Sequence, residues 1–212
     1  MGTLKKIAIV TTHPIQYQSP WFRLMVEKGF QIKVFYTWEQ SGKGKIFDPG
    51  FGKEIKWDIP LLEGYDYEFV KNSSPIPGIT RFLGLINPGL IPSIEAWKAD
   101  CLFVNGWNYY SHLKCMRYFH NKIPVFFRGD SVLLFEKKGI KQLARRSFLK
   151  WVYRHIDYAY YAGTHSKSYF LIHGLRPEQL IYSPHAIDLD RFAEPEEFYS
   201  CLLYTSPSPR DS

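Results

Sequence analysis

The sequence predicts an α/β fold built on a doubly wound, mostly parallel, Rossmann-like sheet. Short apolar runs rich in Ile, Val, Phe and Tyr recur along the chain, and helical patterns lie between most of them. Several runs are apolar throughout instead of alternating with polar residues, as is typical of strands that are covered on both faces. Alternation of strands and helices favours parallel strands joined by right-handed crossovers.

Seven segments carry this strand pattern. They are residues 6–12, 31–37, 66–70, 100–106, 123–129, 157–163 and 179–184. The first helix is expected in SPWFRLMVEKG, with Ser19 as N-cap, Pro20 at the first helical position and Gly29 as the stop. Similar helical patterns cover residues 111–120 and 166–174. The glycine-rich stretch 38–60 interrupts the rhythm, and long loops of this kind are usually functional or mobile.

The chain of 212 residues is long enough for one sizeable domain, which we expect over residues 1–192. Residues 193–200 would begin a linker or a second domain. The end, CLLYTSPSPRDS (201–212), has no apolar periodicity and holds two closely spaced prolines. A DNA sequence that resembles the end of a sequencing-library adapter encodes this segment when translated. We therefore interpret 201–212 as a non-native tail, and expect the natural sequence to be truncated near Ser200.

The amino-acid composition limits the classes of partner that this chain can bind. The chain is 45% hydrophobic and 22% charged, which excludes general disorder. Its net charge of +7, to which Arg210 and Asp211 together add nothing, favours a partner with phosphates: nucleic acid, an anionic membrane or a nucleotide-activated substrate. No standard DNA- or RNA-binding motif is present, so we expect no nucleic acid partner. Cys101 and Cys115 form no metal-ligand pattern, which indicates a cytoplasmic protein without a metal site. No apolar run approaches the length of a signal-peptide core or a membrane span.

Candidate site residues follow the ends of the expected strands, because ligands of open α/β sheets bind beyond the carboxyl ends of the strands. They are Thr12, His13, Gln16, Gln18, Asn105, Trp107, Arg128, Gly129, Asp130 and Thr164. The loop TTHPIQYQSP after the first strand lacks the GxGxxG fingerprint, and SGKGK (41–45) is no P-loop, so a dinucleotide enzyme and a P-loop NTPase are not expected.

Two groups among these residues point to sugar or phosphate chemistry. His13, Gln16 and Gln18 could form a polar rim at the start of a helix, which favours anions, or could merely solvate a loop. In FFRGDS, Arg128 and Asp130 lie at the end of an apolar strand, with Gly129 allowing a ligand close to the backbone. The alternative is an internal Arg128–Asp130 pair that only closes the loop. No Ser-His-Asp order and no paired carboxylates are evident.

The segment 137–154 is basic and contains no acidic residue. Ile140, Leu143, Phe148, Trp151 and Val152 fall near one helical face. Such a helix could rest on anionic lipid headgroups, or could pack on the core with a solvated basic back. The expected membrane-surface residues are Lys137, Lys138, Lys141, Arg145, Arg146 and Lys150.

Three segments carry a family resemblance: IAIVTTHPIQYQSPWFR (7–23), VFFRGDS (125–131) and YAGTHSKSYFLIHGLRPEQLIYSPHAIDLDRF (161–192). With them the chain resembles the amino-terminal domain of bacterial two-domain glycosyltransferases of the GT-B type, family 4-like. The resemblance implies an amino-terminal domain that binds acceptor and a carboxy-terminal one that binds nucleotide sugar, with retention of anomeric configuration and no metal. Arg128 and Asp130 stand where many relatives carry a His-containing motif, and loop 12–18 where many carry a Gly-rich one. His185 and Asp188 fall in the linker motif, so the resemblance implies that they shape the hinge and do not perform chemistry.

The expected function is therefore the acceptor-binding half of a retaining glycosyltransferase. The parent protein would transfer a sugar from a nucleotide sugar to a glycan or lipid-linked acceptor, in cell-envelope polysaccharide synthesis at the inner face of the membrane. Arg128 could hold phosphate, and Asp130 or His13 could bind a hydroxyl. Without the donor half the fragment should be inactive. The alternatives are a non-catalytic module that binds a sugar or an anionic lipid, and a nucleotide-sugar epimerase of GT-B fold.

Overall fold

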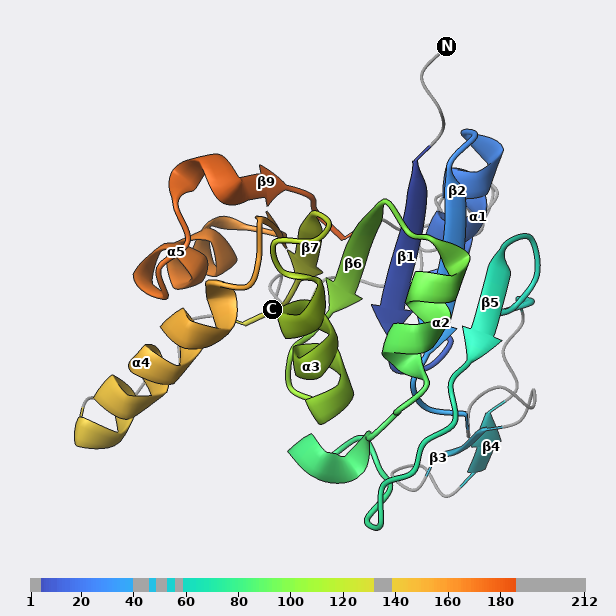
Figure 1. Cartoon of the computed structure of the whole chain (residues 1–212), viewed down its shortest axis with the longest axis horizontal. Coiled ribbons are helices and arrows are strands. Elements are labelled where there is room, and N and C mark those ends of the chain that lie inside the picture. Colours follow the sequence, from blue (N-terminus) through green and yellow to red (C-terminus); the bar gives the residue numbers. More distant parts are fainter. Residues whose placement is uncertain (1–4, 40–45, 49–52, 56–58, 132–138, 186–212) are drawn as a thin grey trace, which may run out of the picture.

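A seven-stranded parallel sheet forms the centre of the protein (Figure 1). The computed structural model describes residues 5–39, 46–48, 53–55, 59–131 and 139–185. The sheet order is β5-β2-β1-β6-β7-β8-β9, with every neighbouring pair parallel. The strands are β1 (Lys6–Thr11), β2 (Gln31–Tyr36), β5 (Asp66–Phe69), β6 (Cys101–Asn105), β7 (Val125–Arg128), β8 (Tyr158–Tyr161) and β9 (Leu180–Tyr182). All seven strands lie in the segments predicted for them, and the α/β doubly wound fold is confirmed.

Five α-helices are seen in the described residues: α1 (Ser19–Glu27), α2 (Leu90–Trp97), α3 (Tyr110–Phe119), α4 (Ile140–Tyr153) and α5 (Thr164–Ile172), with 3-10 turns η1 (Phe82–Gly84) and η3 (Pro177–Gln179). The prediction of Ser19 as N-cap was wrong. Gln18 occupies the cap position, and the Ser19 hydroxyl instead donates to the carbonyl of Leu61 at 2.8 Å. Gly29 ends α1 in a left-handed conformation (φ +87°), as expected of a helix stop.

The stretch 38–60 holds a small second sheet. Strands β3 (Ile46–Asp48) and β4 (Lys53–Ile55) pair antiparallel, and residues 40–45, 49–52 and 56–58 lie outside the described part of the chain. The expected long loop therefore contains a hairpin where β2 leaves the main sheet (Figure 1).

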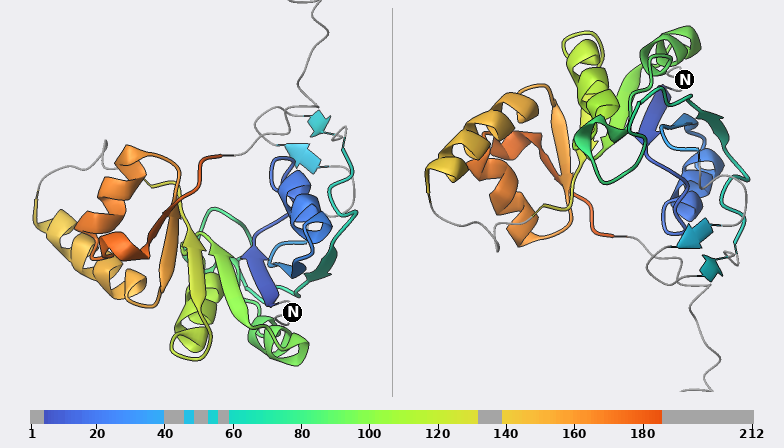
Figure 2. Two further views of the ribbon diagram at one scale, coloured as in Figure 1. Left: turned by 90° about the horizontal axis from the view of Figure 1, so that it is seen from above. Right: turned by 90° about the horizontal axis from the view of Figure 1, so that it is seen from below.

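The two faces of the main sheet are covered by different helices (Figure 2). Val10, Val104 and Phe127 point to the face that packs against α2, α3, α4 and α5. Ile9 and Val34 point to the other face, where Phe22 of α1 covers them. This follows from right-handed crossovers, because the chain moves in one direction from β1 to β2 and in the other from β6 to β9.

The α1 face is incomplete over β7 and β8. Trp21 of α1 packs against Phe103 of β6 at 5.5 Å, but in the part of the chain that the structure describes no helix covers β7 and β8 on that side. Phe126 and Tyr160 are half-buried there, and they line a largely apolar cavity of about 560 Å³. A parallel sheet normally has both faces covered.

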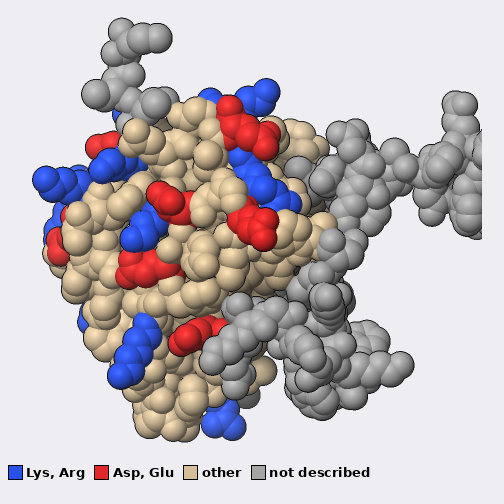
Figure 3. Space-filling model, turned by 90° about the vertical axis from the view of Figure 1, so that its right-hand side faces the viewer, with Lys and Arg blue, Asp and Glu red and all other residues tan. Residues whose placement is uncertain are grey.

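Charge is unevenly distributed. On the side of the molecule beyond the β5 edge, basic and acidic side chains are interspersed (Figure 3). By contrast, α4 carries Lys and Arg without any acidic residue. Helix α4 therefore contributes a local excess of basic charge.

Helix α4 packs on the core through a stripe that includes Leu149, Val152 and Tyr153, all at most 1% exposed. The apolar face predicted from the sequence is buried only in part: Val152 belongs to the buried stripe, whereas Leu143 and Phe148 are 66% and 42% exposed. Arg145 and Lys150 are exposed and Arg146 is half-buried. Lys137 and Lys138 lie outside the described residues, as does the side chain of Lys141.

Candidate functional site at the carboxyl edge of the sheet

The candidate site lies where the strand order reverses. The chain leaves β1 toward β2 on one side, while β6 pairs with β1 on the other, so loops diverge at the carboxyl ends of β1 and β6. A small cavity of about 60 Å³ opens there. It is lined by Tyr17, Gln18, Trp21, Asn105, Arg128, Ser183, Pro184 and His185. Trp21, Arg128 and Ser183 also line the apolar cavity over β6 to β8, so the two hollows adjoin.

Arg128 is the cation of this site. It is the last residue of β7 and is half-buried. Its guanidinium donates to the Ser183 hydroxyl at 3.3 Å, the Pro184 carbonyl at 3.4 Å and Nδ1 of His185 at 3.4 Å. The five N–H groups of Arg exceed these three long contacts, so the contacts within the described residues leave donors for a ligand.

His185 stands between Arg128 and Asp130. Its Nε2 lies 3.4 Å from Oδ1 of Asp130, and its Nδ1 accepts from Arg128. A neutral ring with the proton on Nε2 satisfies both contacts. Arg128 and Asp130 form no ion pair with each other among the described residues, so the alternative of a simple Arg128–Asp130 pair is not what the structure shows. The His185 and Asp130 side chains are 51% and 62% exposed, which leaves both within reach of a substrate.

Tyr17 completes this cluster. Its ring meets His185 edge-on at a centroid distance of 6.4 Å. Burial raises the pKa of the Tyr17 phenol, the nearby Asp130 carboxylate raises it further, and Arg128 acts in the opposite direction. The phenol therefore stays protonated at neutral pH and can donate a hydrogen bond.

Asn105 brings an unpaired donor to the cavity. Its Nδ2 is buried and has no hydrogen-bond partner among the described residues. Buried polar groups are rarely left unpaired, so this amide is available to a ligand or a water molecule. Next to it, Gly106 adopts a left-handed conformation (φ +73°) and donates its N–H to the carbonyl of Arg128 at 2.9 Å. This bond ties the ends of β6 and β7 together.

The buried imidazole of His112 stabilises the carboxyl edge of the sheet from the α3 side. His112 of α3 is fully buried, and its Nδ1 lies 3.2 and 3.0 Å from the carbonyls of Asn105 and Gly106. Its Nε2 lies 3.0 Å from the hydroxyl of Thr37, which follows β2. Desolvation lowers the pKa of His112 to about 4, so the ring is neutral at pH 7. It connects α3 to the ends of two strands.

Of the predicted site residues, Gln18, Asn105 and Arg128 line the small cavity, and Asp130 joins it through His185. Thr12 and His13 lie beside it without lining it. Their side chains bond to each other at 2.9 Å, and burial lowers the pKa of His13. Half-buried Gln16 and exposed Thr164, at the start of α5, do not line it either.

Two predicted residues have a different surrounding from the one expected. Trp107 points to the α3–α4 side and packs against Phe148 at 5.6 Å. At Gly129 a side chain would collide with the ring of Phe127, at 2.8 Å. Glycine is therefore required there for packing. Its predicted approach to a ligand stays a prediction.

Tyr17, Trp21, Ser183 and Pro184 were not among the predicted site residues. Their only signal in the sequence is their position in or next to segments that follow β1 and β9. Among the residues that the structure describes, no group of three or more His, Cys, Asp and Glu side chains could hold a metal ion. None of the described helices is long and apolar enough to span a membrane.

Comparison with known proteins identifies the fold. The sequence matches no protein-family model, and no curated protein matches it. Among solved structures, Anabaena HepE in complex with UDP and glucose matches with a TM-score of 0.57 at 16% identity, over 93% of this chain and 49% of that chain. UDP-N-acetylglucosamine 2-epimerase from Rickettsia bellii matches with a TM-score of 0.59 at 17% identity, over 96% of this chain and 49% of that chain. The chain thus spans about half the length of these structures, and its fold is one half of a GT-B fold.

Proposed function

We propose that this chain is the acceptor-binding half of a glycosyltransferase that uses a nucleotide sugar. The observation that carries the proposal is the cluster of Arg128, His185 and Asp130 beside the unpaired amide of Asn105, at the carboxyl edge of half a GT-B fold. HepE, which shares the fold, was solved with UDP and glucose and with UDP-glucose. The second half of the parent protein would hold most of the donor.

The cluster suits the chemistry of sugar transfer. When an acceptor hydroxyl attacks the anomeric carbon, the bond to the nucleoside diphosphate breaks, positive charge develops on the sugar and negative charge on the leaving phosphate. Arg128 would stabilise the leaving phosphate. Asp130, or the neutral His13, would accept a hydrogen bond from the acceptor hydroxyl. Retention of configuration, independence of a metal and a lipid-linked or glycan acceptor are parts of this proposal.

Attachment to the inner face of the membrane belongs to the same proposal. Exposed Arg145 and Lys150 on α4, together with exposed Leu143, offer charge and apolar surface for anionic headgroups. Sedimentation with vesicles tests this part. Binding to anionic but not neutral vesicles, lost at high salt, would support it, and no binding to anionic vesicles at low salt would contradict it.

The first experiment is to sequence the source locus across the codon for Ser200 and express the whole open reading frame. We expect it to encode a second α/β domain and to release UDP from a UDP-sugar only when an acceptor is present. Asp130→Asn should reduce transfer about 100-fold or more, while Asp66→Asn, an exposed carboxylate at the opposite edge of the sheet, should leave it unchanged. A stop codon after a genomically encoded CLLYTSPSPRDS would contradict the proposal.

A nucleotide-sugar epimerase is the second candidate, because the Rickettsia bellii epimerase has the same fold over this chain. The same preparation distinguishes the two. An epimerase would interconvert two UDP-sugars without an acceptor, and a transferase would form a new glycoside that depends on it. A chain that binds sugar without turnover in either assay would point to the non-catalytic module.

A further inference from the structure

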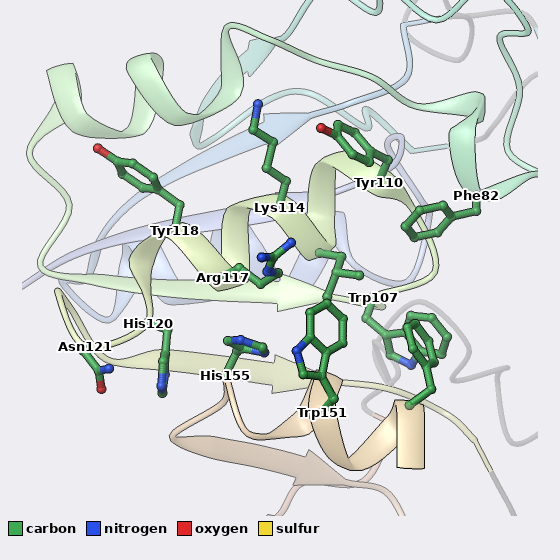
Figure 4. A pocket seen from close by; sticks show the side chains of 12 residues that line it. Phe82, Trp107, Tyr110, Lys114, Arg117, Tyr118, His120, Asn121, Trp151 and His155 are labelled. Atoms are coloured by element: carbon green, nitrogen blue, oxygen red, sulfur yellow. The ribbon is translucent and has the colours of Figure 1, made fainter. Parts of the chain in front are cut away.

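A groove runs between α3 and α4 on the helical side of the sheet, separate from the carboxyl-edge cavity (Figure 4). Its volume is about 980 Å³, at the upper end of the range for small-molecule sites. Figure 4 shows Arg117 pointing from α3 toward Trp151 of α4, with His120 and His155 side by side near one end. Trp107 lies toward the other end.

One wall of the groove is a row of rings. Trp107 packs against Phe148 at 5.6 Å, Phe148 against Trp151 at 5.7 Å, and Trp151 against His155 at 5.2 Å. Arg117 lies over the Trp151 ring at 5.0 Å. The rings give this wall a continuous apolar surface, and Arg117 occupies one face of Trp151.

The other wall carries positive charge without an ion-pair partner among the described residues. Arg117 and Lys114 are exposed on α3, and within the described ranges neither has a carboxylate within 4 Å. No Asp or Glu of the described residues lines the groove. Glu95 accepts a hydrogen bond from Tyr118, which lines the groove, but does not line it itself. Cations beside an apolar wall call for a ligand that is anionic at one end and apolar along the rest.

We propose that this groove binds a single lipid phosphate: an apolar chain that ends in a phosphate. The phosphate would lie at Arg117, near the imidazoles of His120 and His155, which are 5.3 Å apart. The chain would run along Trp151 and Phe148 toward Trp107. Guanidinium groups bind phosphate oxygens in pairs, which favours phosphate at this position.

The mouth of the groove suggests a bilayer as the source of the lipid. Phe82 and Phe148 line the groove and are 40% and 42% exposed, and Leu83 beside Phe82 is 47% exposed. The segment before α2 is held against α3, because Tyr109 donates to the carbonyl of Ile79 at 2.9 Å. Exposed apolar side chains gathered at the rim of a pocket are typical of membrane or ligand contact.

This inference does not rest on the proposed sugar transfer, because the groove could hold a lipid phosphate without any reaction at the carboxyl edge. If the proposed sugar transfer is confirmed, this inference would name lipid phosphates as a substrate class of the protein. Its test uses the chain alone and measures binding, so that its failure leaves the transferase proposal standing.

The probe is decyl phosphate below its micelle concentration, titrated while tryptophan fluorescence is recorded, since two of the six tryptophans line the groove. Decanol, inorganic phosphate and UMP are titrated in parallel. We expect decyl phosphate to bind at least tenfold more tightly than each of these. Arg117→Ala should weaken binding about tenfold or more, and Phe148→Ala should weaken it as well.

Lys28→Ala is the matched control, because it removes an exposed cation at the end of α1, on the other face of the sheet. It should bind like the unaltered chain. Equal binding of decyl phosphate and decanol, or unaltered affinity in Arg117→Ala with native circular dichroism, would overturn the proposal. Tighter binding of UMP would assign the groove to nucleotides or RNA instead, and equal binding of inorganic phosphate would assign it to the free anion.

Discussion

Lowering the pH should reduce the free energy of unfolding through protonation of His112, the buried imidazole of α3 next to the carboxyl edge of the sheet. Both carbonyls near its Nδ1 require a proton on that nitrogen, so Nε2 must accept from the Thr37 hydroxyl. A second proton, on Nε2, could be accepted by the Thr37 hydroxyl, which would then donate to the carbonyl of Thr11 at 3.3 Å, but it would place a charge in a fully buried position. The folded pKa of about 4 lies below the ordinary value of 6.5. Between these values the unfolded chain binds the extra proton and the folded one does not, so stability falls as the pH falls.

The size of the effect follows from the two pKa values. Each unit is worth about 1.4 kcal/mol, so protonation of His112 should remove about 3 kcal/mol of the free energy of unfolding, starting near pH 6.5 and complete below pH 4. This is a substantial share of the ~5–15 kcal/mol that holds a typical domain folded. The stabilisation is fully present at pH 7.

Urea unfolding at pH 7.0, 5.5 and 4.5 measures this loss. His112→Asn is the comparison variant, because an amide can still donate to one carbonyl but does not titrate in this range. The unaltered chain should lose about 2–3 kcal/mol more than this variant between pH 7 and 4.5. Identical pH dependence would refute the reasoning. If His112→Asn does not fold, an NMR titration of the His112 ring in the unaltered chain decides, and a pKa near 6.5 would equally refute it.

Two further predictions concern packing and buried hydrogen bonds. Gly129→Ala should destabilise the fold by about 1–3 kcal/mol, because the new methyl group would meet Phe127, whose ring is held by Tyr153 and Phe170. Gly89→Ala, where the nearest atom is at an ordinary 3.6 Å, should cost less, and equal costs in urea unfolding would contradict the packing argument. Asn87→Ala should cost about 2–4 kcal/mol, because the Asn87 amide donates to the carbonyls of Thr37 at 3.0 Å and Val70 at 2.7 Å. Exposed Ser168→Ala should change the unfolding free energy by less than about 0.5 kcal/mol, and a similar small change for Asn87→Ala would show that water replaces its bonds.

The amino-acid sequence by itself determined the strands, their parallel arrangement and the edge where the site lies. Each strand is a short apolar run, and burial on both faces is a local property that such runs reveal. The carboxyl-end rule then selected Gln18, Asn105, Arg128 and Asp130, which the structure gathers into or beside one cavity.

Only the tertiary structure decided which side chains meet. His185 reaches Arg128 across 57 residues of sequence, because β9 follows β8 in the sheet and carries the chain back to the end of β7. Trp107 follows β6 as expected, yet the start of α3 turns it toward Phe148 and the groove. On α4 the periodicity allowed more than one apolar face, and contact with the sheet selected the stripe of Leu149, Val152 and Tyr153. Local pattern shows which residues can be buried, whereas their partners depend on how distant segments pack.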